Sequence, residues 1–195
     1  MHKLDKFGDN LKSIREDFEY VNKTLKPIHG FTQGRTAHAF RNVYPIFAPD
    51  GTHIGAMEIS FPTEMLQRYL NDVSNIHSHF LVHKSVFESK AWQRSDRILN
   101  YTPSDEHPDY MVTLLDTYGN DNCLKNNPQY LAQEALEIEK KIVAKNPFAI
   151  YISMPNTIKV VTFYPIKQAV TKETVGWIVS YENDELIADI LKNTM

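Results

Sequence analysis

The chain has 195 residues, with 21 basic and 24 acidic side chains and a formal net charge of −3. This length allows one larger domain or two small ones, and the scattered lysines and arginines give no sign of a nucleic-acid-binding surface. The apolar stretches are far shorter than the about 18 residues of a membrane-spanning helix, and the single cysteine excludes an internal disulfide.

The first half of the sequence predicts a helix, a β-hairpin and a second helix. Apolar residues recur at spacings of three and four between Leu11 and Leu25, which is typical of one stripe along a helix. Strands are predicted at 37–47 and 54–61. Asp50-Gly51 predicts a two-residue type I′ turn between them, because that turn needs positive φ at both central positions. Thr63 is a candidate N-cap for the next helix.

The second half predicts another helix, three strands and a final helix, after a polar connection at 91–127. A helix begins at Asn127-Pro128, since proline is tolerated at the first helical position. Three β-prone segments then indicate an antiparallel meander: 148–153, 158–165 and 175–181. A last helix is expected from Asn183 to Met195. Helices and antiparallel strands are mixed without strict βαβ alternation, so the predicted fold class is α+β.

Two segments about 120 residues apart resemble each other. One strand in each contains an aromatic-Pro-Ile sequence, Tyr44-Pro45-Ile46 and Tyr164-Pro165-Ile166. The next strand in each contains a glycine and then a Ser-aromatic pair at almost equal spacing: Gly55 with Ser60-Phe61, and Gly176 with Ser180-Tyr181. This similarity predicts two copies of one strand–turn–strand–helix unit.

The same residues carry a resemblance to a known family. Four segments are similar, in the same order, to the double Cache sensory domains of bacterial transmembrane receptors: 1–9, 30–35, 40–47 and 51–60. The similarity extends to the second repeat. It implies two PAS-like units in an extracytoplasmic (periplasmic) domain, placed between two membrane helices of a histidine kinase, chemoreceptor or diguanylate cyclase. It also implies that ligand binds in the membrane-distal unit.

On this resemblance, residues 1–100 are expected to form the first, membrane-distal unit and residues 101–195 the second, membrane-proximal unit. The sequence departs from the family pattern because it has no membrane helix, and no long helix and first strand before His2-Lys3. We therefore expect a truncated domain whose first unit is incomplete.

The resemblance and the hairpin suggest three ligand contacts. Arg35 is one candidate, because the glycines around it allow close backbone approach and the family pattern shares the residue. In the expected register Arg41 and Glu58 lie diagonally on one sheet face. They could grip an anionic group and a cationic or hydroxyl group of a ligand. The alternative is a cross-strand ion pair.

The opposite face of the hairpin is expected to be mostly core, with three further candidate ligand contacts: His38, Phe40 and Tyr44. His38 and Tyr44 would be the polar groups of an otherwise apolar pocket. The alternative for His38 is a buried histidine with its hydrogen bonds satisfied.

Three histidines, His77, His79 and His83, raise a metal hypothesis, but we expect no single helix or strand to present all three. We therefore expect no metal site and no cofactor. Catalytic motifs are missing as well, and no catalytic residue is predicted. Acidic residues and a histidine do cluster in a polar, proline-bounded loop: Asp105, Glu106, His107 and Asp109.

The expected function is a sensory domain that binds a small anionic or zwitterionic ligand and passes a signal through the last helix toward the membrane. One alternative is a soluble hydrolase or transferase, which a pocket lined by two or more of Asp105, His107 and Asp109 would favour. Another is a pocket-free module that forms a homodimer through the helices at 11–25 and 186–191. Nucleic acid is not an expected partner.

Overall fold

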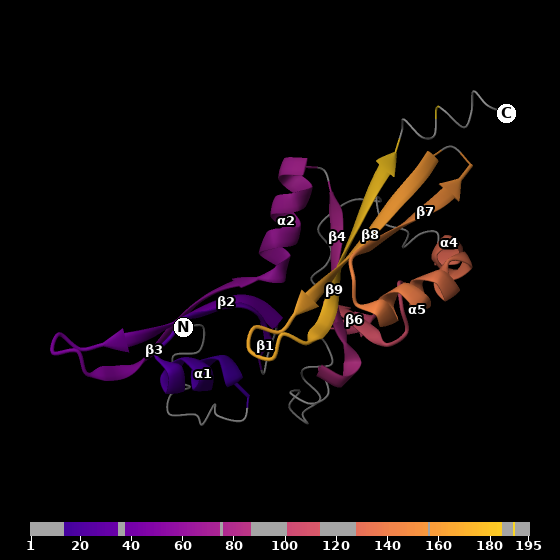
Figure 1. Ribbon diagram of the computed structural model, residues 1–195. Coiled ribbons are helices and arrows are strands. Elements are labelled where there is room, and N and C mark those ends of the chain that lie inside the picture. The colour runs from indigo at the N-terminus through magenta and orange to yellow at the C-terminus, as the bar shows by residue number, and fades with distance from the viewer. Residues whose placement is uncertain are drawn as a thin grey trace.

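The computed structural model describes residues 14–34, 38–74, 76–86, 101–113, 128–155, 157–184 and 189. These residues form two antiparallel sheets and several helices (Figure 1). One sheet has the strand order β1-β2-β3, and the other has the order β5-β6-β4-β9-β8-β7. The α+β class is confirmed. None of the helices in this part of the chain is long and apolar enough to cross a membrane.

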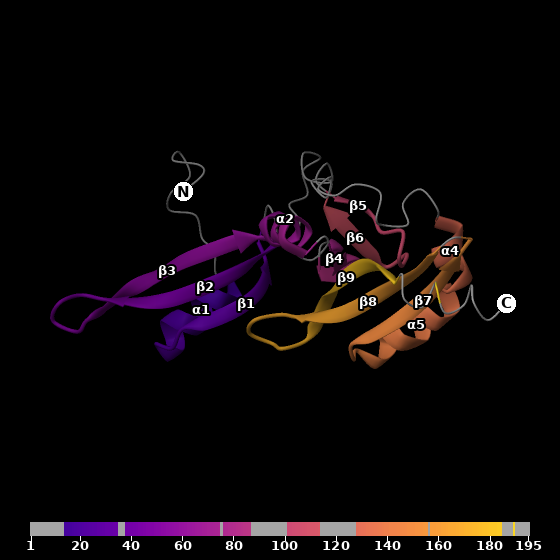
Figure 2. The same ribbon diagram turned by 90° about the horizontal axis from the view of Figure 1, so that it is seen from above.

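The first sheet is a meander with one helix on one face. Its elements are α1 (Glu16–Thr24), β1 (Ile28–Gln33), β2 (His38–Phe47) and β3 (His53–Pro62). Val21 of α1 is fully buried against Ile28 and Val43, so α1 covers the face of the sheet that carries Val43. Figure 2 shows α1 lying along this sheet. Helix α2 (Thr63–Ser74) follows β3 directly.

The second sheet holds the larger core. Its elements are β4 (His77–His83), β5 (Tyr101–Pro103), β6 (Tyr110–Thr113), α4 (Pro128–Gln133), α5 (Ala135–Ala144), β7 (Phe148–Met154), β8 (Thr157–Lys167) and β9 (Thr174–Asp184). Trp177 and Val179 pack against Ile138 of α5 on one face. Two antiparallel sheets flanked by a few helices are consistent with a PAS-like fold.

The strand–turn–strand part of the predicted repeat is present in the described residues. Ile46 pairs with Gly55 and Ile166 with Gly176, and the register of both hairpins shifts directly after the isoleucine. The two hairpins lie in separate sheets. The equivalence also includes the preceding helices, since α1 and α5 both end at a left-handed residue, Leu25 or Lys145, two positions before a proline. The succession α1-β1-β2-β3 therefore matches α5-β7-β8-β9.

The predicted type I′ turn is wrong. Gly51 has a φ of 83°, but Asp50 is not among the residues with positive φ. The backbone N–H of Gly51 donates to Ala48 O at 2.9 Å, so the hairpin has a three-residue loop. Phe47 consequently pairs with His53 rather than Ile54. The register shift beside Ile46 compensates for the longer loop, which leaves the pairing farther along the strands as predicted.

Two further expectations need correction. Strand β9 continues to Asp184, so no helix begins at Asn183, and most of the expected last helix lies outside the described residues. The polar connection at 91–127 contributes strands β5 and β6. Strand β4 pairs with β9, so the second sheet also takes a strand from before residue 100. The division of the chain at residue 100 stays a prediction.

The turn between β8 and β9 joins the two sheets. The backbone N–H of Ala169 donates to Phe31 O at 3.0 Å, and Ala169 is buried beside Val21, Ile28 and Val43. Gly30 has a φ of 143°, and a Cβ there would lie 3.1 Å from Ala169 Cβ. The first sheet therefore packs closely against a turn of the second.

Candidate ligand-binding site

Arg41 and Glu58, two of the predicted site residues, lie in an ion network under α1. Glu58 Oε1 accepts from Arg41 and its Oε2 accepts from Arg15. Arg15 also donates to Asp17 through Nε at 2.9 Å and Nη2 at 2.8 Å. Asp17 is 1% exposed and accepts from Thr32 as well. Both oxygens of Glu58 are thus bound by guanidinium groups, which favours the ion-pair interpretation.

The charges in this network stabilise one another. Burial by itself raises the pKa of Glu58, but the charges of Arg41 and Arg15 and their hydrogen bonds hold it below its ordinary value. Burial also lowers the pKa of Arg15, and the hydrogen bonds and charges of Asp17 and Glu58 raise it above its ordinary value. The sequence did not predict Arg15 and Asp17 as members of this network, because they lie off the apolar stripe of the helix. Their opposite charges two positions apart were the signal that could have indicated an ion pair.

His38 is a core histidine with satisfied hydrogen bonds. It is 1% exposed, and its Nε2 lies 2.8 Å from Thr63 Oγ1 while its Nδ1 lies 3.1 Å from the Tyr101 hydroxyl. Burial and the nearby charge of Arg41 lower its pKa to about 3. A neutral imidazole that links β2, α2 and β5 fits a structural role.

The expectation that the opposite face of the hairpin is mostly core is wrong. Side chains on this face are about half-exposed: Tyr44 37%, Ile46 37%, Met57 48%, Ile59 49% and Phe61 47%. Phe40 is the partial exception, because it packs beside Phe31, Phe80 and Val82 at the junction with the second sheet. The remaining predicted contact, Arg35, lies outside the described residues.

A pocket of about 410 Å³ lies at this junction. Its walls come from β1, β2, β8, β9 and the segment between α5 and β7: Gly30, Phe31, Phe40, Lys145, Asn146, Pro147, Tyr164, Pro165, Ile166, Lys167 and Ile178. Phe40 is the predicted site residue that lines it. The volume is within the about 300–1,000 Å³ of small-molecule sites, and the walls are mostly apolar, as such sites require.

The charge of this pocket is one-sided. Lys145 and Lys167 are its charged lining residues, and no described carboxylate lines it. Lys145 occupies the left-handed position that ends α5, and Lys167 lies at the end of β8. Two ammonium groups beside an apolar wall favour a ligand with an anionic group and an apolar body.

A second pocket, of about 390 Å³, is more polar. It is lined by His107 and Asp109 of the loop between β5 and β6, together with His83, Ser85, Glu139 and Lys145. His107 Nε2 lies 2.6 Å from Glu139 Oε2, and His83 Nδ1 lies 2.7 Å from Ser85 Oγ. Two of the three loop residues that were expected to favour an enzyme therefore line a pocket.

The three histidines at 77, 79 and 83 do share one element, contrary to the expectation. They lie two and four positions apart on β4, and an even spacing puts all three on one face of the strand. His77 Nε2 and His79 Nε2 are 2.7 Å apart, and His79 Nδ1 is bonded to Glu106. His83 bonds Ser85 instead. In the described part of the chain, no group of three or more His, Cys, Asp or Glu side chains could hold a metal ion.

Comparison with known proteins identifies no family. No protein-family model matches the chain, and no curated protein matches its sequence. Among solved structures, methyl-accepting chemotaxis protein X is similar over 87% of this chain, with 13% identity and a TM-score of 0.35. The chain spans 55% of the length of that structure. A likeness at this TM-score carries no argument about function.

Proposed function

We propose that this chain is a sensory domain that binds a small anionic or zwitterionic molecule in the pocket between its two sheets. The observation that supports the proposal is the pocket itself, whose apolar walls come from both repeats and whose charged lining residues are Lys145 and Lys167. In this proposal the ligand lies at the boundary of the first hairpin rather than over Arg41 and Glu58, whose charges are already paired.

A ligand in this pocket would act on the contact between the sheets. Gly30 and Phe31 line the pocket and also contact Ala169 in the turn after β8. A ligand shifts a two-state equilibrium by its difference in affinity for the two states. A molecule that fits one spacing of β1 and β8 therefore favours that arrangement of the two sheets.

The wider setting is part of the same proposal. The double Cache resemblance of the sequence, with which the α+β fold is consistent, supports a periplasmic receptor domain whose signal crosses the membrane to an output domain. In this proposal the domain itself catalyses no reaction and needs no cofactor.

A thermal-shift screen of small carboxylates, amino acids and phosphates tests the proposal. We expect at least one compound to raise the Tm, since binding to the native state alone adds about 2.7 kcal/mol at a hundredfold excess over Kd. Lys145→Gln and Lys167→Gln should each abolish the shift, and Lys140→Gln, on the exposed side of α5, should retain it. A shift that survives in both pocket variants would contradict the site. If the ligand-induced Tm shift were lost only in Arg35→Ala, the ligand site would instead lie at the first hairpin.

The second candidate function is a hydrolase centred on the polar pocket. Ser85 Oγ is within hydrogen-bond distance of His83 Nδ1, a pairing that activates nucleophiles. However, the backbone N–H of Ser85 donates to the same nitrogen at 3.2 Å, which is the pattern of a local turn. Hydrolysis of p-nitrophenyl esters that is lost in both Ser85→Ala and His83→Ala would favour the enzyme.

A further inference from the structure

An apolar corner on the outside of the first sheet has no described element covering it. It consists of eight side chains with exposed fractions of 37–63%: Tyr44, Ile46, Met57, Ile59, Phe61, Met65, Tyr69 and Val73. The first five lie on β2 and β3 and the last three on α2. Isolated exposed apolar residues are ordinary on a protein surface, but a contiguous group of large ones marks an interaction site.

The strand register explains why these residues share one face. Tyr44 pairs with Met57, so their side chains lie on the same side of the sheet, and the alternation of a strand places Ile46, Ile59 and Phe61 there too. The other face carries Val43 and is covered by α1. The face under α1 thus holds Val43 and the Arg41–Glu58 pair, whereas the opposite, apolar face is packed by no described element.

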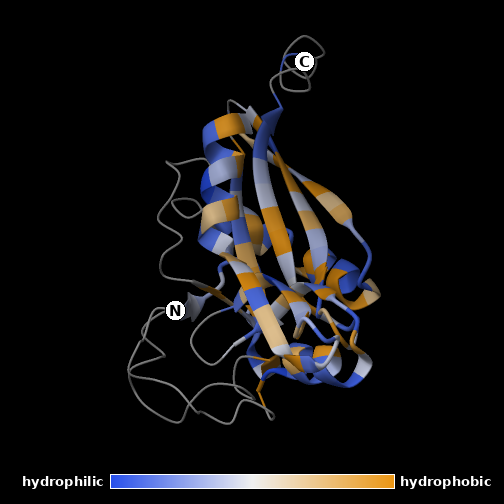
Figure 3. Cartoon of the chain, turned by 90° about the vertical axis from the view of Figure 1, so that its left-hand side faces the viewer, coloured by the Kyte–Doolittle hydropathy of each residue, from blue (hydrophilic) through white to orange (hydrophobic). Residues whose placement is uncertain are grey.

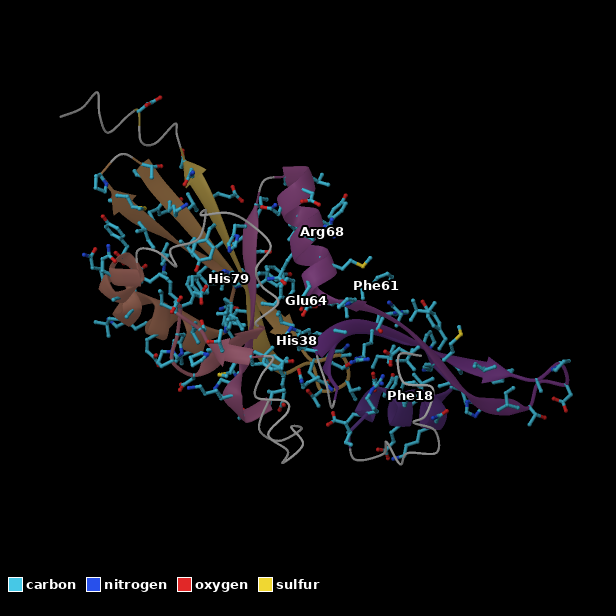
Figure 4. All side chains as sticks on the ribbon, turned by 180° about the vertical axis from the view of Figure 1, so that it is seen from behind. Phe18, His38, Phe61, Glu64, Arg68 and His79 are labelled. Carbon is cyan, nitrogen blue, oxygen red and sulfur yellow. The ribbon has the colours of Figure 1, made fainter. Side chains whose placement is uncertain are left out.

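Helix α2 forms the second wall of the corner. Its inner side is occupied, because Leu66 packs on the core of the second sheet and Gln67 Nε2 donates to Ser78 O at 2.8 Å. Figure 4 shows α2 standing over the end of the hairpin, with Phe61 at its base and Arg68 partway along it. Figure 3 shows hydrophobic segments on both α2 and the neighbouring strands.

The size of the corner matches that of a protein interface. A large side chain has about 200 Å² of surface, so eight of them at about half exposure present on the order of 800 Å². This is about the area that each partner contributes to a standard interface. The charged pair Arg68–Asp72, whose side chains are 65% and 59% exposed, lies beside it on α2 and would form part of a polar rim.

We propose that the apolar corner binds the apolar corner of a second copy of this chain. Around a two-fold axis, α2 of one protomer lies on the β2–β3 face of its partner, and the same contact forms twice. A surface with one helix wall and one sheet wall is self-complementary in this way. The chain already makes this kind of contact internally, where Leu66 of α2 packs beside Phe80 and Val82 of β4.

Sedimentation velocity over a concentration series tests the dimer. We expect the wild type to form a dimer. Ile59→Glu and Tyr69→Glu should each raise the dissociation constant of the dimer at least tenfold, because each substitution buries a charge in the interface. Two matched controls carry the same substitution at similarly exposed sites elsewhere: Tyr151→Glu on β7 (60% exposed) and Leu136→Glu on α5 (68%). Both should dimerise like the wild type, and far-UV circular dichroism checks that every variant is folded.

A mixing experiment tests the helix-on-sheet arrangement. Protomers with Tyr69→Lys and protomers with Ile59→Glu should each be monomeric. Mixed together, they should form a heterodimer, in which one of the two contacts is native and the other joins opposite charges. The proposal would be overturned if the wild type stayed monomeric at about 100 μM. A wild-type dimer that the corner variants leave intact would overturn it too.

Discussion

The hydroxyl of Tyr181 donates a hydrogen bond to Glu106 Oε1 at 2.6 Å, which ties strand β9 to the loop between β5 and β6. Ser104 and His79 also form hydrogen bonds with the buried carboxylate of Glu106. Tyr181→Phe removes one donor and leaves the shape nearly unchanged. We expect it to lower the free energy of unfolding by about 2 kcal/mol, since hydrogen bonds to charged groups contribute about 1.5–3 kcal/mol. Urea unfolding measures this change. Tyr151→Phe, on the exposed side of β7, is the control and should leave the free energy of unfolding unchanged.

The Glu106 carboxylate should also make stability depend on pH. Burial alone would raise its pKa, but the charge of His79 and the hydrogen bonds from His79, Ser104 and Tyr181 lower it from 4.5 to about 2. A pKa that is lower in the folded state contributes stability above the unfolded pKa, and this contribution is lost as the pH falls from about 4.5 toward 2.

The difference in unfolding free energy between wild type and Glu106→Gln should therefore shrink as the pH is lowered from about 6 to about 3. Urea unfolding at a series of pH values measures it. Glu182→Gln, an exposed residue of the same strand as Tyr181, serves as the control and should run parallel to the wild type. A constant difference for Glu106→Gln would contradict a charged carboxylate in the core.

Gly30 should tolerate alanine less well than Gly55 does. Both have a φ that disfavours L side chains, 143° and 150°, so both substitutions strain the backbone. At Gly55 the space is open, whereas at Gly30 the new Cβ would lie 3.1 Å from Ala169 Cβ. We expect Gly30→Ala to cost about 1 kcal/mol more than Gly55→Ala, measured by urea unfolding. Adding Ala169→Gly should recover part of that difference, and equal costs for the two alanines would argue against close packing of β1 on the turn.

Glu58 should stabilise the fold through its ion pairs with Arg15 and Arg41. Glu58→Gln leaves Arg15 and Arg41 without the carboxylate that both bind, so we expect a loss of about 2 kcal/mol in unfolding free energy. Replacing Arg41 and Glu58 together by methionine should cost less than the sum of Arg41→Met and Glu58→Met, because the double variant loses their shared ion pair only once. Additive costs in this double-mutant cycle would show that the two side chains do not interact.

Much of the fold could be predicted because its signals are local. The pairing of Val43 with Glu58 and of Arg41 with Ser60 was predicted correctly, because the strand period of two is kept and the register shift beside Ile46 offsets the longer loop. The similarity of the two hairpins was visible in the sequence, because Tyr44-Pro45-Ile46 recurs as Tyr164-Pro165-Ile166. The type I′ turn and the helix at Asn183 were wrong because tertiary context decides a loop conformation and the length of a strand.

The candidate site was harder to predict, because a pocket belongs to no single segment. Phe40 was expected at a ligand site, but Lys145 and Lys167 were not, since isolated lysines in a sequence look like surface residues. They line one pocket with Phe40 only because the second sheet packs beside the first. His107 and Asp109 likewise reach a common pocket with Glu139 through the packing of α5.

The sequence by itself determined the α+β class, the two repeated hairpins and the helices before them, because these depend on residues a few positions apart. Only the tertiary structure decided which charges are paired, which apolar face remains open and where a ligand could fit. The physical reason is that burial and electrostatic pairing depend on distances between residues such as Arg15 and Glu58, which the chain separates and the fold brings together.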